Sequence, residues 1–299
     1  MDRLQAMEAF VAVVDCGGFA SAARRLDLSA PVVTRAVAEL EARLGVRLLT
    51  RTTRAVRVTE AGARYAEDCR RILADMAEAD SATSGSRSAL KGLLGVTAPV
   101  LFGNLHVTPI VAGYLQRYPD VDAHCVFVDR VVNLVDEGLD VAVRIGELPD
   151  SSLKAVAVGR VRRMLVASPA YLAAQGRPQR PADLAGHTLI QPVGVSPYPE
   201  WRFAEGGRPL VQRIRPRLRT TTNDAARSFA LAGLGIARLI SYQVADALAR
   251  GELLPLLEDF ETPPLPVHVV HHEGRHMTQK VRAFVDLAVD ALRANPALR

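Results

Sequence analysis

Apolar positions near the N-terminus recur at helical spacing and predict a short helix with a small-residue inner face, formed by Phe19, Ala22, Ala23 and Leu26. Asp27 and Leu28 then break this pattern. Ser29 can cap a second helix through its hydroxyl, and Pro31 suits that helix's first turn, where a missing N–H costs nothing. The stretch therefore predicts a helix-turn-helix whose second helix begins near Ala30.

The second helix has one apolar stripe and one mixed face. Its core-facing positions are Val33, Val37, Leu40 and Leu44, and its other face presents Val32, Thr34, Arg35, Ala38 and Glu39. Such a face suits the major groove of DNA, where residues near the helix N-terminus reach base edges. Pairs of amphipathic helices also occur in many all-helical cores, so this stretch alone leaves both interpretations open.

An arginine-rich segment follows the helix pair directly. Residues 42–59 include Arg43, Arg47, Arg51, Arg54 and Arg57 and no acidic residue. Short apolar segments at 48–49 and 56–58 flank a turn at 52–54 and can pair as strands. A basic run is often only a solvated surface, but this position predicts a wing whose arginines contact phosphate and enter the minor groove.

A long helix is predicted after the wing, with Thr59 as its N-cap and a helical pattern that continues to about Ala82. Its apolar side consists of Ala63, Ala66, Ile72, Leu73, Met76 and Ala79. This stripe needs a cover, which is either the helix's own chain or a second copy of the protein. Small and polar residues at 84–86 and 91–92 then mark a joint.

From Leu93 onward short β-rich runs alternate with helices, which predicts α/β architecture with mainly parallel strands. The expected strands are 93–96, 121–128, 139–145, 164–167, 189–191, 213–219 and 267–272, and the expected helices are 103–118, 131–137, 224–232 and 279–292.

Composition refines this picture only slightly. A chain of 299 residues suggests two or three domains, and a net charge of +5 is weakly consistent with a polyanionic partner. The opening Met-Asp-Arg and an early Glu8 do not resemble a secretory signal, and no apolar run reaches the length of a membrane span, so a cytoplasmic protein is expected. Three widely spaced cysteines, Cys16, Cys69 and Cys125, indicate reduced thiols, with redox sensing by one of them left open.

Several clusters in the C-terminal half carry possible chemistry. The alternating arginines Arg213, Arg215, Arg217 and Arg219 would share one strand face, which is either solvated or in contact with another subunit, or an anion site. The histidines His271, His272 and His276 lie at a strand end and loop without acidic neighbours, so no metal site is expected. The Gly233-Leu234-Gly235 run follows a helix and is not a dinucleotide loop. No nucleophile paired with a base is recognisable, so no catalytic residue is expected.

The run from Met1 to Gly62 resembles the winged helix-turn-helix of LysR-type transcriptional regulators. The matching residues are Leu4, Met7 and Phe10, Gly17-Gly18-Phe19, Ala22-Ala23-Arg24-Arg25-Leu26, Ser29, Pro31, Val33-Thr34-Arg35, Leu40-Glu41, Leu44-Gly45, Leu48-Leu49, Arg51 and Thr59-Glu60-Ala61-Gly62. In one departure, this chain has Ala30 where family members often carry Gln. An amide that reads an adenine edge is therefore absent, and a base preference cannot be transferred.

The resemblance covers essentially the whole chain and implies its organisation. It implies an all-α winged helix-turn-helix at 1–59, a linker and dimerisation helix with its joint at 60–91, and a two-lobed, periplasmic-binding-protein-like α/β effector domain at 92–299. Lobe I would comprise 92–161 and 268–299, and lobe II 162–267. The implied partners are promoter DNA, a small-molecule effector and further copies of the chain, as a homodimer through the linker helix and then a homotetramer, with no cofactor and no membrane.

Two sets of site residues follow. The DNA-binding set is Ser21, Ser29, Ala30, Pro31, Val32, Thr34, Arg35, Arg51, Thr53 and Arg54. The effector set is Thr97, Ala98, Pro99, Leu101, Arg144, Gly146, Thr222 and Asn223, because carboxyl ends of strands and free N–H groups of the following helices converge in such clefts. Arg144 either balances the effector's charge or bridges the lobes as a structural arginine.

The leading hypothesis is therefore a sequence-specific transcriptional regulator whose effector binds between the lobes and alters the geometry of promoter binding. The alternatives are a two-lobed α/β enzyme whose N-terminal helices serve only oligomerisation, and a redox sensor that uses Cys125 or Cys16. The arginine wing and the lack of a catalytic constellation favour the regulator.

Overall fold

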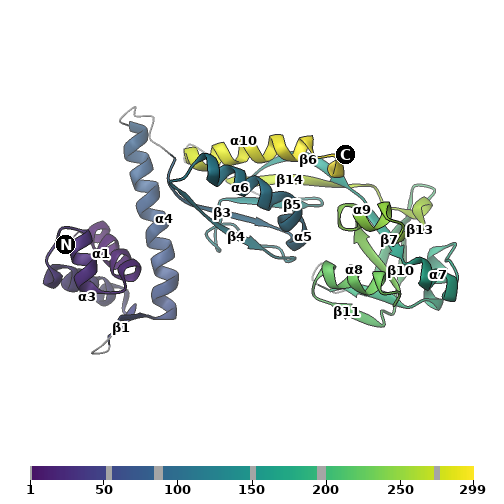
Figure 1. Ribbon diagram of the computed structural model, residues 1–299, viewed down its shortest axis with the longest axis horizontal. Coiled ribbons are helices and arrows are strands. Elements are labelled where there is room, and N and C mark those ends of the chain that lie inside the picture. Colours follow the sequence, from purple (N-terminus) through teal and green to yellow (C-terminus); the bar gives the residue numbers. More distant parts are fainter. Residues whose placement is uncertain (1, 52–55, 84–89, 149–152, 194–199, 273–276) are drawn as a thin grey trace. The chain divides into compact units, whose positions relative to one another are not determined.

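The computed structural model describes residues 2–51, 56–83, 90–148, 153–193, 200–272 and 277–299. The chain forms two compact units, drawn in Figure 1: residues 1–94 with 118–122, and residues 95–117 with 123–299. Within these described ranges, no single helix is both long and apolar enough to cross a membrane. The two N-terminal helices satisfy that test only when taken together as a pair bent by 118°.

The first unit is a winged helix-turn-helix followed by a long helix, as predicted. Its elements are α1 (Arg3–Cys16), α2 (Phe19–Arg25), α3 (Ala30–Leu44), β1 (Leu49–Arg51), β2 (Val56–Val58) and α4 (Glu60–Thr83). β1 and β2 pair in antiparallel register and form the wing. Thr59 caps α4, since its hydroxyl accepts a hydrogen bond from the N–H of Gly62 at 2.9 Å.

The prediction that the Ser29 hydroxyl caps α3 is wrong. Ser29 occupies the N-cap position, but its side chain makes no capping bond. The second helical position is Pro31, which has no N–H to donate, and the N–H groups of Val32 and Val33 donate to the Ser29 carbonyl at 3.0 and 3.2 Å instead.

A single apolar core holds the first unit together. Its fully buried members include Phe10 and Val13 of α1, Ala22 of α2, and Val33 and Val37 of α3. The first half of α4 packs on the same core through Ala66, Cys69 and Leu73, and it lies alongside the smaller helices in Figure 1. Part of the apolar stripe on α4 is therefore covered by its own chain.

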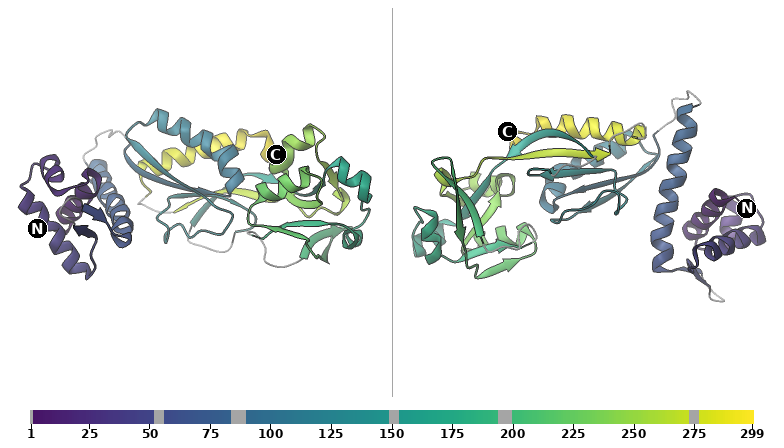
Figure 2. Two further views of the ribbon diagram at one scale, coloured as in Figure 1. Left: turned by 60° about the horizontal axis from the view of Figure 1, so that its bottom comes forward. Right: turned by 180° about the vertical axis from the view of Figure 1, so that it is seen from behind.

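The second unit contains two five-stranded sheets. The first sheet has the order β4-β3-β5-β14-β6 and is formed by β3 (Gly92–Ala98), β4 (Val121–Phe127), β5 (Val141–Ile145), β6 (Leu153–Val161) and β14 (Leu265–His272). The short helix α5 (Val100–Phe102) and a π-helical turn at Gly103–Val107 lead into α6 (Thr108–Arg117). The C-terminal helix α10 (Gln279–Ala294) lies beside α6 on the same face of this sheet, as both views in Figures 1 and 2 show.

The second sheet has the order β11-β8-β12-β7-β13. Its strands are β7 (Arg163–Ala167), β8 (Leu189–Pro192), β11 (Leu218–Thr220), β12 (Ile236–Ile240) and β13 (Leu254–Leu256). The helices around it are α7 (Pro169–Gln175), α8 (Asn223–Leu231) and α9 (Ser241–Ala249), and a separate hairpin is formed by β9 (Glu200–Glu205) and β10 (Arg208–Arg213). Short 3-10 turns lie at Pro181–Gly186, Glu258–Phe260 and Pro296–Leu298.

Two connections join the sheets. β6 passes into β7 at Arg162, whose N–H donates to the Ser241 Oγ at 3.1 Å and whose guanidinium lies 3.4 Å from the Glu261 carboxylate. The chain returns after β13, and β14 inserts antiparallel between β5 and β6. The predicted α/β fold with two lobes is thus confirmed.

The prediction of mainly parallel strands is wrong. β3 pairs parallel with β5, and β8 pairs parallel with both β11 and β12. The strands that carry the chain between the sheets run the other way, since β14 is antiparallel to β5 and β6, and β7 is antiparallel to β12 and β13. Both sheets are therefore mixed.

Two further predicted elements are absent. Residues 131–137 form turns rather than a helix, because the Asn133 Oδ1 accepts from the N–H of Val135 at 3.0 Å and competes with helical bonding. The predicted strand at 213–219 is split between β10, which ends at Arg213, and β11, which begins at Leu218 in another sheet. Pro216, which has no N–H to pair, lies in the gap, so the four alternating arginines do not share one strand face.

Candidate functional site

The outer face of α3 is exposed as its amphipathic pattern predicts. Pro31, Arg35 and Ala38 are exposed, Val32 retains 37% of its accessible surface and Thr34 is half-buried. Arg35 makes no hydrogen bond or ion pair with any residue in the described ranges. α3 therefore offers a guanidinium fork beside small side chains, which is suited to insertion into a groove.

The other predicted DNA contacts surround this face or lie beyond what the structure describes. Ser29 is exposed, Ala30 is half-buried, and the Ser21 hydroxyl accepts from Arg24 at 3.4 Å. Arg51 belongs to β1. Thr53 and Arg54 lie outside the described residues.

The base of the wing is held by hydrogen bonds to its backbone. The Glu41 carboxylate accepts from the N–H groups of Leu48 and Leu49 at 2.8 and 3.0 Å. The Thr59 hydroxyl donates to the Arg47 carbonyl at 2.9 Å, while the Thr59 N–H donates to the Leu48 carbonyl, also at 2.9 Å. The Glu41 carboxylate, just before the arginine-rich run, thus binds backbone N–H groups, and the side chains of Arg43, Arg47 and Arg57 are exposed.

Two close contacts join α4 to the wing and to the smaller helices. A Cβ at Gly62 would lie 2.0 Å from the Leu48 carbonyl oxygen, so only glycine permits this approach. The Asp15 carboxylate of α1 lies 3.4 Å from the guanidinium of Arg25 in α2 and 2.5 Å from that of Arg70 in α4. These contacts fix the start of α4 against the DNA-binding helices.

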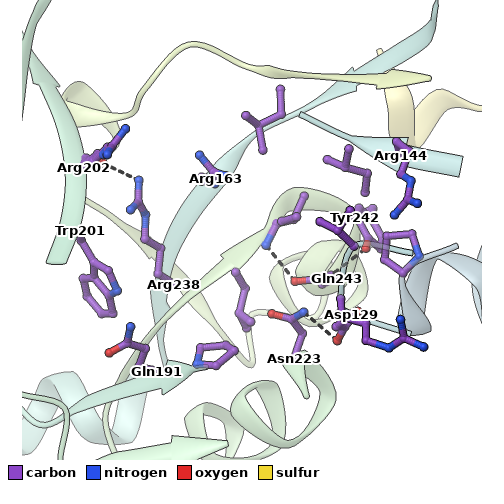
Figure 3. A pocket seen from close by; sticks show the side chains of 18 of the residues that line it. Asp129, Arg144, Arg163, Gln191, Trp201, Arg202, Asn223, Arg238, Tyr242 and Gln243 are labelled. Atoms are coloured by element: carbon purple, nitrogen blue, oxygen red, sulfur yellow. Dashed lines mark hydrogen bonds between the residues drawn. The ribbon is translucent and has the colours of Figure 1, made fainter. Parts of the chain in front are cut away.

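A cavity of about 480 Å³ lies in the second unit, lined by residues of both sheets (Figure 3). This volume is within the range of small-molecule sites. The polar and aromatic lining residues are Asp129, Arg130, Arg144, Arg163, Gln191, Glu200, Trp201, Arg202, Asn223, Arg238, Tyr242 and Gln243, and the apolar ones are Pro99, Val128, Val131, Ile145, Pro192, Leu239, Ile240 and Leu265.

Three arginines and a tryptophan form one wall of the cavity. Arg163 extends from β7, Arg238 from the neighbouring β12, and Arg202 from the hairpin strand β9. Burial, together with the positive charges of Arg163 and Arg202, lowers the pKa of Arg238 to about 10. Burial, followed by the charge of Arg202, also lowers the pKa of Arg163. Trp201, the single tryptophan of the chain, is 4% exposed beside them.

The opposite wall is a hydrogen-bonded polar network. The Asn223 amide donates to the Asp129 carboxylate at 3.2 Å, and the other oxygen of Asp129 accepts from the N–H of Val100 at 3.0 Å. The Gln243 amide donates to the Tyr242 hydroxyl at 3.2 Å. Burial raises the pKa of Tyr242, so this phenol stays protonated. The Asn223 to Asp129 bond joins α8, beside the second sheet, to the loop after β4 of the first.

The structure brings only three of the predicted effector residues to the cavity: Pro99, Arg144 and Asn223. Thr97 is 2% exposed, and its hydroxyl donates to the Val126 carbonyl at 2.7 Å. The Thr222 hydroxyl caps α8 by accepting from the N–H of Ala225 at 3.3 Å. Three others are not among the lining residues: Ala98, which is buried, Leu101, and Gly146, a turn residue with a φ of 112°.

Arg144 has a local role that neither sequence-based alternative described. Its guanidinium donates to the carbonyl of Val132, within the turns that follow β4. Burial lowers its pKa. This contact lies within the first lobe and does not bridge the two lobes.

Most of the polar residues that line the cavity were not predicted from the sequence, among them Arg163, Trp201, Arg202 and Arg238. A signal for Arg238 was present, because a lone arginine interrupts the apolar run Ile236–Ile240 of an interior strand. The hairpin β9–β10, which carries Trp201 and Arg202, was not predicted.

The described lining offers no pair of residues for nucleophilic catalysis. Among the residues that the structure describes, no serine, threonine, cysteine or histidine lines the cavity. Across the described ranges, no group of three histidine, cysteine, aspartate or glutamate residues is arranged to hold a metal ion; His276 lies outside them.

The cysteines are free thiols, and two of them are poorly activated. Burial raises the pKa of Cys69 to about 11 and also raises the pKa of Cys125. A thiol with a raised pKa has little thiolate at neutral pH and reacts slowly with oxidants. These environments do not favour a redox sensor at either cysteine.

Comparison with known proteins identifies the family of both parts of the chain. A family model described as "Bacterial regulatory helix-turn-helix protein, lysR family" matches residues 4–63, and one described as "LysR substrate binding domain" matches residues 87–293. The HTH-type transcriptional regulator CrgA of Neisseria meningitidis serogroup B is 34% identical over 288 residues, 96% of each chain. The HTH-type transcriptional activator AaeR of Escherichia coli K12 is 32% identical over 294 residues, 97% of this chain and 94% of that one.

Solved structures match nearly the whole chain. The structure of CrgA superimposes with a TM-score of 0.62 at 33% identity and covers 97% of this chain and 99% of its own. Full-length AphB, a virulence activator of Vibrio cholerae and a member of the LTTR protein family, gives a TM-score of 0.61 at 28% identity with the same coverage.

Proposed function

The chain belongs to the LysR family of transcriptional regulators, which bind DNA and are not enzymes, and we propose on that premise how its own residues divide the work. α3 reads bases in the major groove and the wing holds the flanking phosphates. A small molecule in the cavity of the second unit then controls how the DNA-binding helices engage the promoter.

Arg35 is proposed as the main base-reading side chain. It is exposed near the start of α3 and has no partner in the part of the chain that the structure describes, so it can turn to a guanine edge without breaking a contact. Arg51 and the other wing arginines are proposed to bind phosphate, which gives affinity without sequence preference. The exposed, unpartnered guanidinium on an otherwise small-residue helix face is the observation that carries this assignment.

The test is a DNA-binding titration with the region upstream of the protein's own gene and a random duplex of equal length. Arg35→Ala should lose about 1–3 kcal/mol on the cognate site and little on the random duplex. Arg51→Ala should weaken both duplexes equally and reduce the salt slope by about one unit. Arg208→Ala, an exposed arginine of β10, is the matched control and should bind as the unaltered protein does. An unchanged ratio of cognate to random affinity in Arg35→Ala would reject this docking.

Pairing through α4 is proposed as the basis of a dimer. Ile72 and Met76 each retain 41% of their accessible surface, whereas Ala66 and Cys69 on the same helix are buried in the core of the unit. One recognition helix reads too few base pairs for tight, specific binding, so two copies are needed. Further association of dimers into a tetramer is part of this proposal.

Replacing Ile72 and Met76 together by Asp should disperse the dimer and abolish tight promoter binding, because charges would occupy a surface that is dry in the assembly. Sedimentation velocity measures the first effect and the DNA titration the second. Glu67→Lys, an exposed substitution on α4, serves as the control for altered helix charge. A double variant that sediments as the unaltered protein does would exclude this part of α4 from the interface.

The cavity is proposed as the effector site because its lining comes from both sheets. The Asn223 to Asp129 hydrogen bond links the two lobes at this cavity. A ligand that contacts both walls stabilises one relative angle of the lobes and shifts the population toward it. Through α4, such a shift changes the spacing of the two recognition helices on DNA.

A further inference from the structure

The arginine wall of the cavity is assembled from three separate strands. Arg163 lies in β7, Arg238 lies in β12, the strand paired with β7, and Arg202 lies in the hairpin strand β9. Figure 3 shows the three guanidinium groups near one another, with the Trp201 indole close to Arg238. The fold therefore concentrates positive charge at one place in an otherwise mixed cavity.

Acidic partners do not balance this wall within the residues that the structure describes. Glu200 lies 4.0 Å from Arg202, at the limit of an ion pair. Glu261 pairs with Arg162, and burial raises the pKa of the Glu261 carboxyl. Arg163 has no ion pair in the described ranges. Three cations thus face the cavity with one weakly placed carboxylate among the lining residues beside them.

Arg238 is only partly satisfied by its surroundings. One terminal nitrogen donates to the Arg202 carbonyl, and the guanidinium carbon lies 5.4 Å from the centre of the Phe203 ring. The Nε is buried and has no hydrogen-bond partner in the described part of the chain. If Arg238 only stabilised the contact between β12 and the hairpin, we would expect its Nε to have a hydrogen-bond acceptor as well.

Arg163 and Arg238 are partly withdrawn from water, and the exposed Arg202 adds a third positive charge beside them. Like charges held together at a partly buried place are unfavourable unless an anion neutralises them. The lowered pKa values of Arg163 and Arg238 express this cost. Guanidinium forks match the geometry of carboxylate and phosphate oxygens, and they bind such groups more strongly than neutral ones. An anionic ligand removes the repulsion between these guanidinium groups.

The rest of the cavity indicates how such a ligand lies. The other cations of the lining are already engaged, since Arg130 forms a two-pronged ion pair with Glu137 and Arg144 donates to the Val132 carbonyl. The far wall contains the Asp129 carboxylate, which repels a second anion. Its neutral donors and acceptors, with Pro99 and Tyr242, suit the uncharged body of a small molecule.

We propose that Arg163, Arg202 and Arg238 form the seat for the anionic group of the effector, and that the effector is a small organic anion whose carboxylate or phosphate binds there beside Trp201. This inference rests on the proposed effector function and specifies the chemical class of ligand. It also assigns orientation, with the charged end toward β7, β9 and β12 and the uncharged end toward Asn223 and Tyr242.

Trp201 provides a direct readout because it is the single tryptophan of the chain and lines the cavity. Tryptophan emission of the full-length protein is titrated with benzoate and, as a neutral compound of similar shape, with benzamide. Benzoate should give a saturable change and benzamide should give none over the same range. Inorganic phosphate should displace benzoate, because both groups bind the same forks.

Arginine variants distinguish specific binding of benzoate at the three cavity arginines from general electrostatic attraction to the protein. R238Q and R163Q should each weaken the benzoate response at least tenfold, whereas R208Q, which removes an exposed arginine of β10, should leave it unchanged. Thermal unfolding of each variant verifies that it is folded. If R163Q is unfolded, R163K keeps the charge, loses the fork and should still weaken the response.

Three results would overturn the inference: equal responses to benzoate and benzamide, no saturable response to benzoate, or full benzoate affinity in folded R163Q and R238Q. The titration contains no DNA, so its failure is distinct from a failure of promoter binding. Saturable binding of neutral compounds alone would reject an anionic effector and leave the cavity as the proposed effector site.

Discussion

Arginine is used in opposite settings in the two units. Arg35, Arg43, Arg47 and Arg57 are exposed and come from one stretch of fewer than thirty residues, and the fold needs only to present them. Arg163, Arg202 and Arg238 come from three strands spread over more than seventy residues. Arg163 and Arg238 are partly withdrawn from water, and the exposed Arg202 lies beside them. Exposed charge costs the fold little, whereas clustered buried charge opposes folding. The buried cluster is therefore the more informative sign of a ligand.

The largest expected loss of stability comes from the contact between α4 and the wing, which positions the exposed arginines. Gly62→Ala places a Cβ 2.0 Å from the Leu48 carbonyl oxygen, so α4 or the wing must shift. The free energy of unfolding of the first unit should fall by about 3 kcal/mol, as expected for overpacking against backbone. Chemical denaturation of the full-length protein measures this loss.

Gly113→Ala is the matched control, because Gly113 lies within α6 and a Cβ there would meet no atom within 4 Å. This substitution should raise stability by about 0.5–1 kcal/mol through the better helix propensity of alanine. A Gly62→Ala protein as stable as the unaltered one would show that α4 and the wing are not held in close contact.

A substitution in the cavity is expected to raise the free energy of unfolding, by less than Gly62→Ala lowers it. Arg238→Met removes a buried cation that Arg163 and Arg202 repel, while the methionine keeps much of the contact with Phe203. The free energy of unfolding should rise by about 1 kcal/mol, although the anion response is lost. Thermal unfolding without ligand is the measurement.

Arg250→Met is the comparison for Arg238→Met, since the Arg250 guanidinium is exposed in its ion pair with Glu252 at 3.0 Å and should contribute little to stability. Destabilisation of Arg238→Met by 2 kcal/mol or more would make Arg238 a structural brace. The contrast between exposed and buried arginines would then no longer indicate a ligand.

The smallest expected change in stability involves His106, a half-buried group that, unlike arginine, can lose its charge near neutral pH. It packs edge-on against Phe102 and Tyr242, and the Asn295 amide nitrogen lies 2.9 Å from its Nδ1. An amide nitrogen can only donate, so Nδ1 accepts and the ring is neutral. Burial lowers the pKa of His106 below its usual value of 6.5.

The direction in which His106 makes stability depend on pH follows from proton binding. Between the lowered pKa and 6.5 the unfolded chain binds a proton at this position and the folded chain does not. The stability associated with neutral His106 is therefore present above pH 6.5 and is lost as pH falls below it. Between pH 7.5 and pH 5.5, the free energy of unfolding of His106→Gln should fall by about 0.5 kcal/mol less than that of the unaltered protein. Melting temperatures at the two pH values report this difference. Identical pH profiles would show that His106 does not contribute.

Prediction from sequence succeeded wherever local periodicity determined the contacts. The helix-turn-helix, the wing and the Thr59 cap depend on residues within a few turns of one another, and each was found as expected. It failed where a local alternative competed, as with the Asn133 side chain that replaced a helix by turns. It also failed for Ser29, where Pro31 removed the donor that a capping hydroxyl requires.

The predicted effector site shows the same division. The general rule that strand ends and helix starts converge led to Pro99 and Asn223, both of which line the cavity. The same rule also selected Thr97 and Thr222, whose hydroxyls are instead engaged by the Val126 carbonyl and the N–H of Ala225. Proximity to a strand end is visible in the sequence, but the partner of a hydroxyl is not.

The sequence by itself determined the family, the DNA-binding element and the two-lobed α/β class, because periodicity and a contiguous set of motif residues encode these features locally. Only the tertiary structure decided which side chains share the cavity. Mixed sheets, an unpredicted hairpin and the return of β14 between β5 and β6 bring distant strands together. Arg163, Arg202 and Arg238 are ordinary arginines along the chain and become a charged cluster only when β7, β9 and β12 meet, since electrostatic repulsion depends on distance in space.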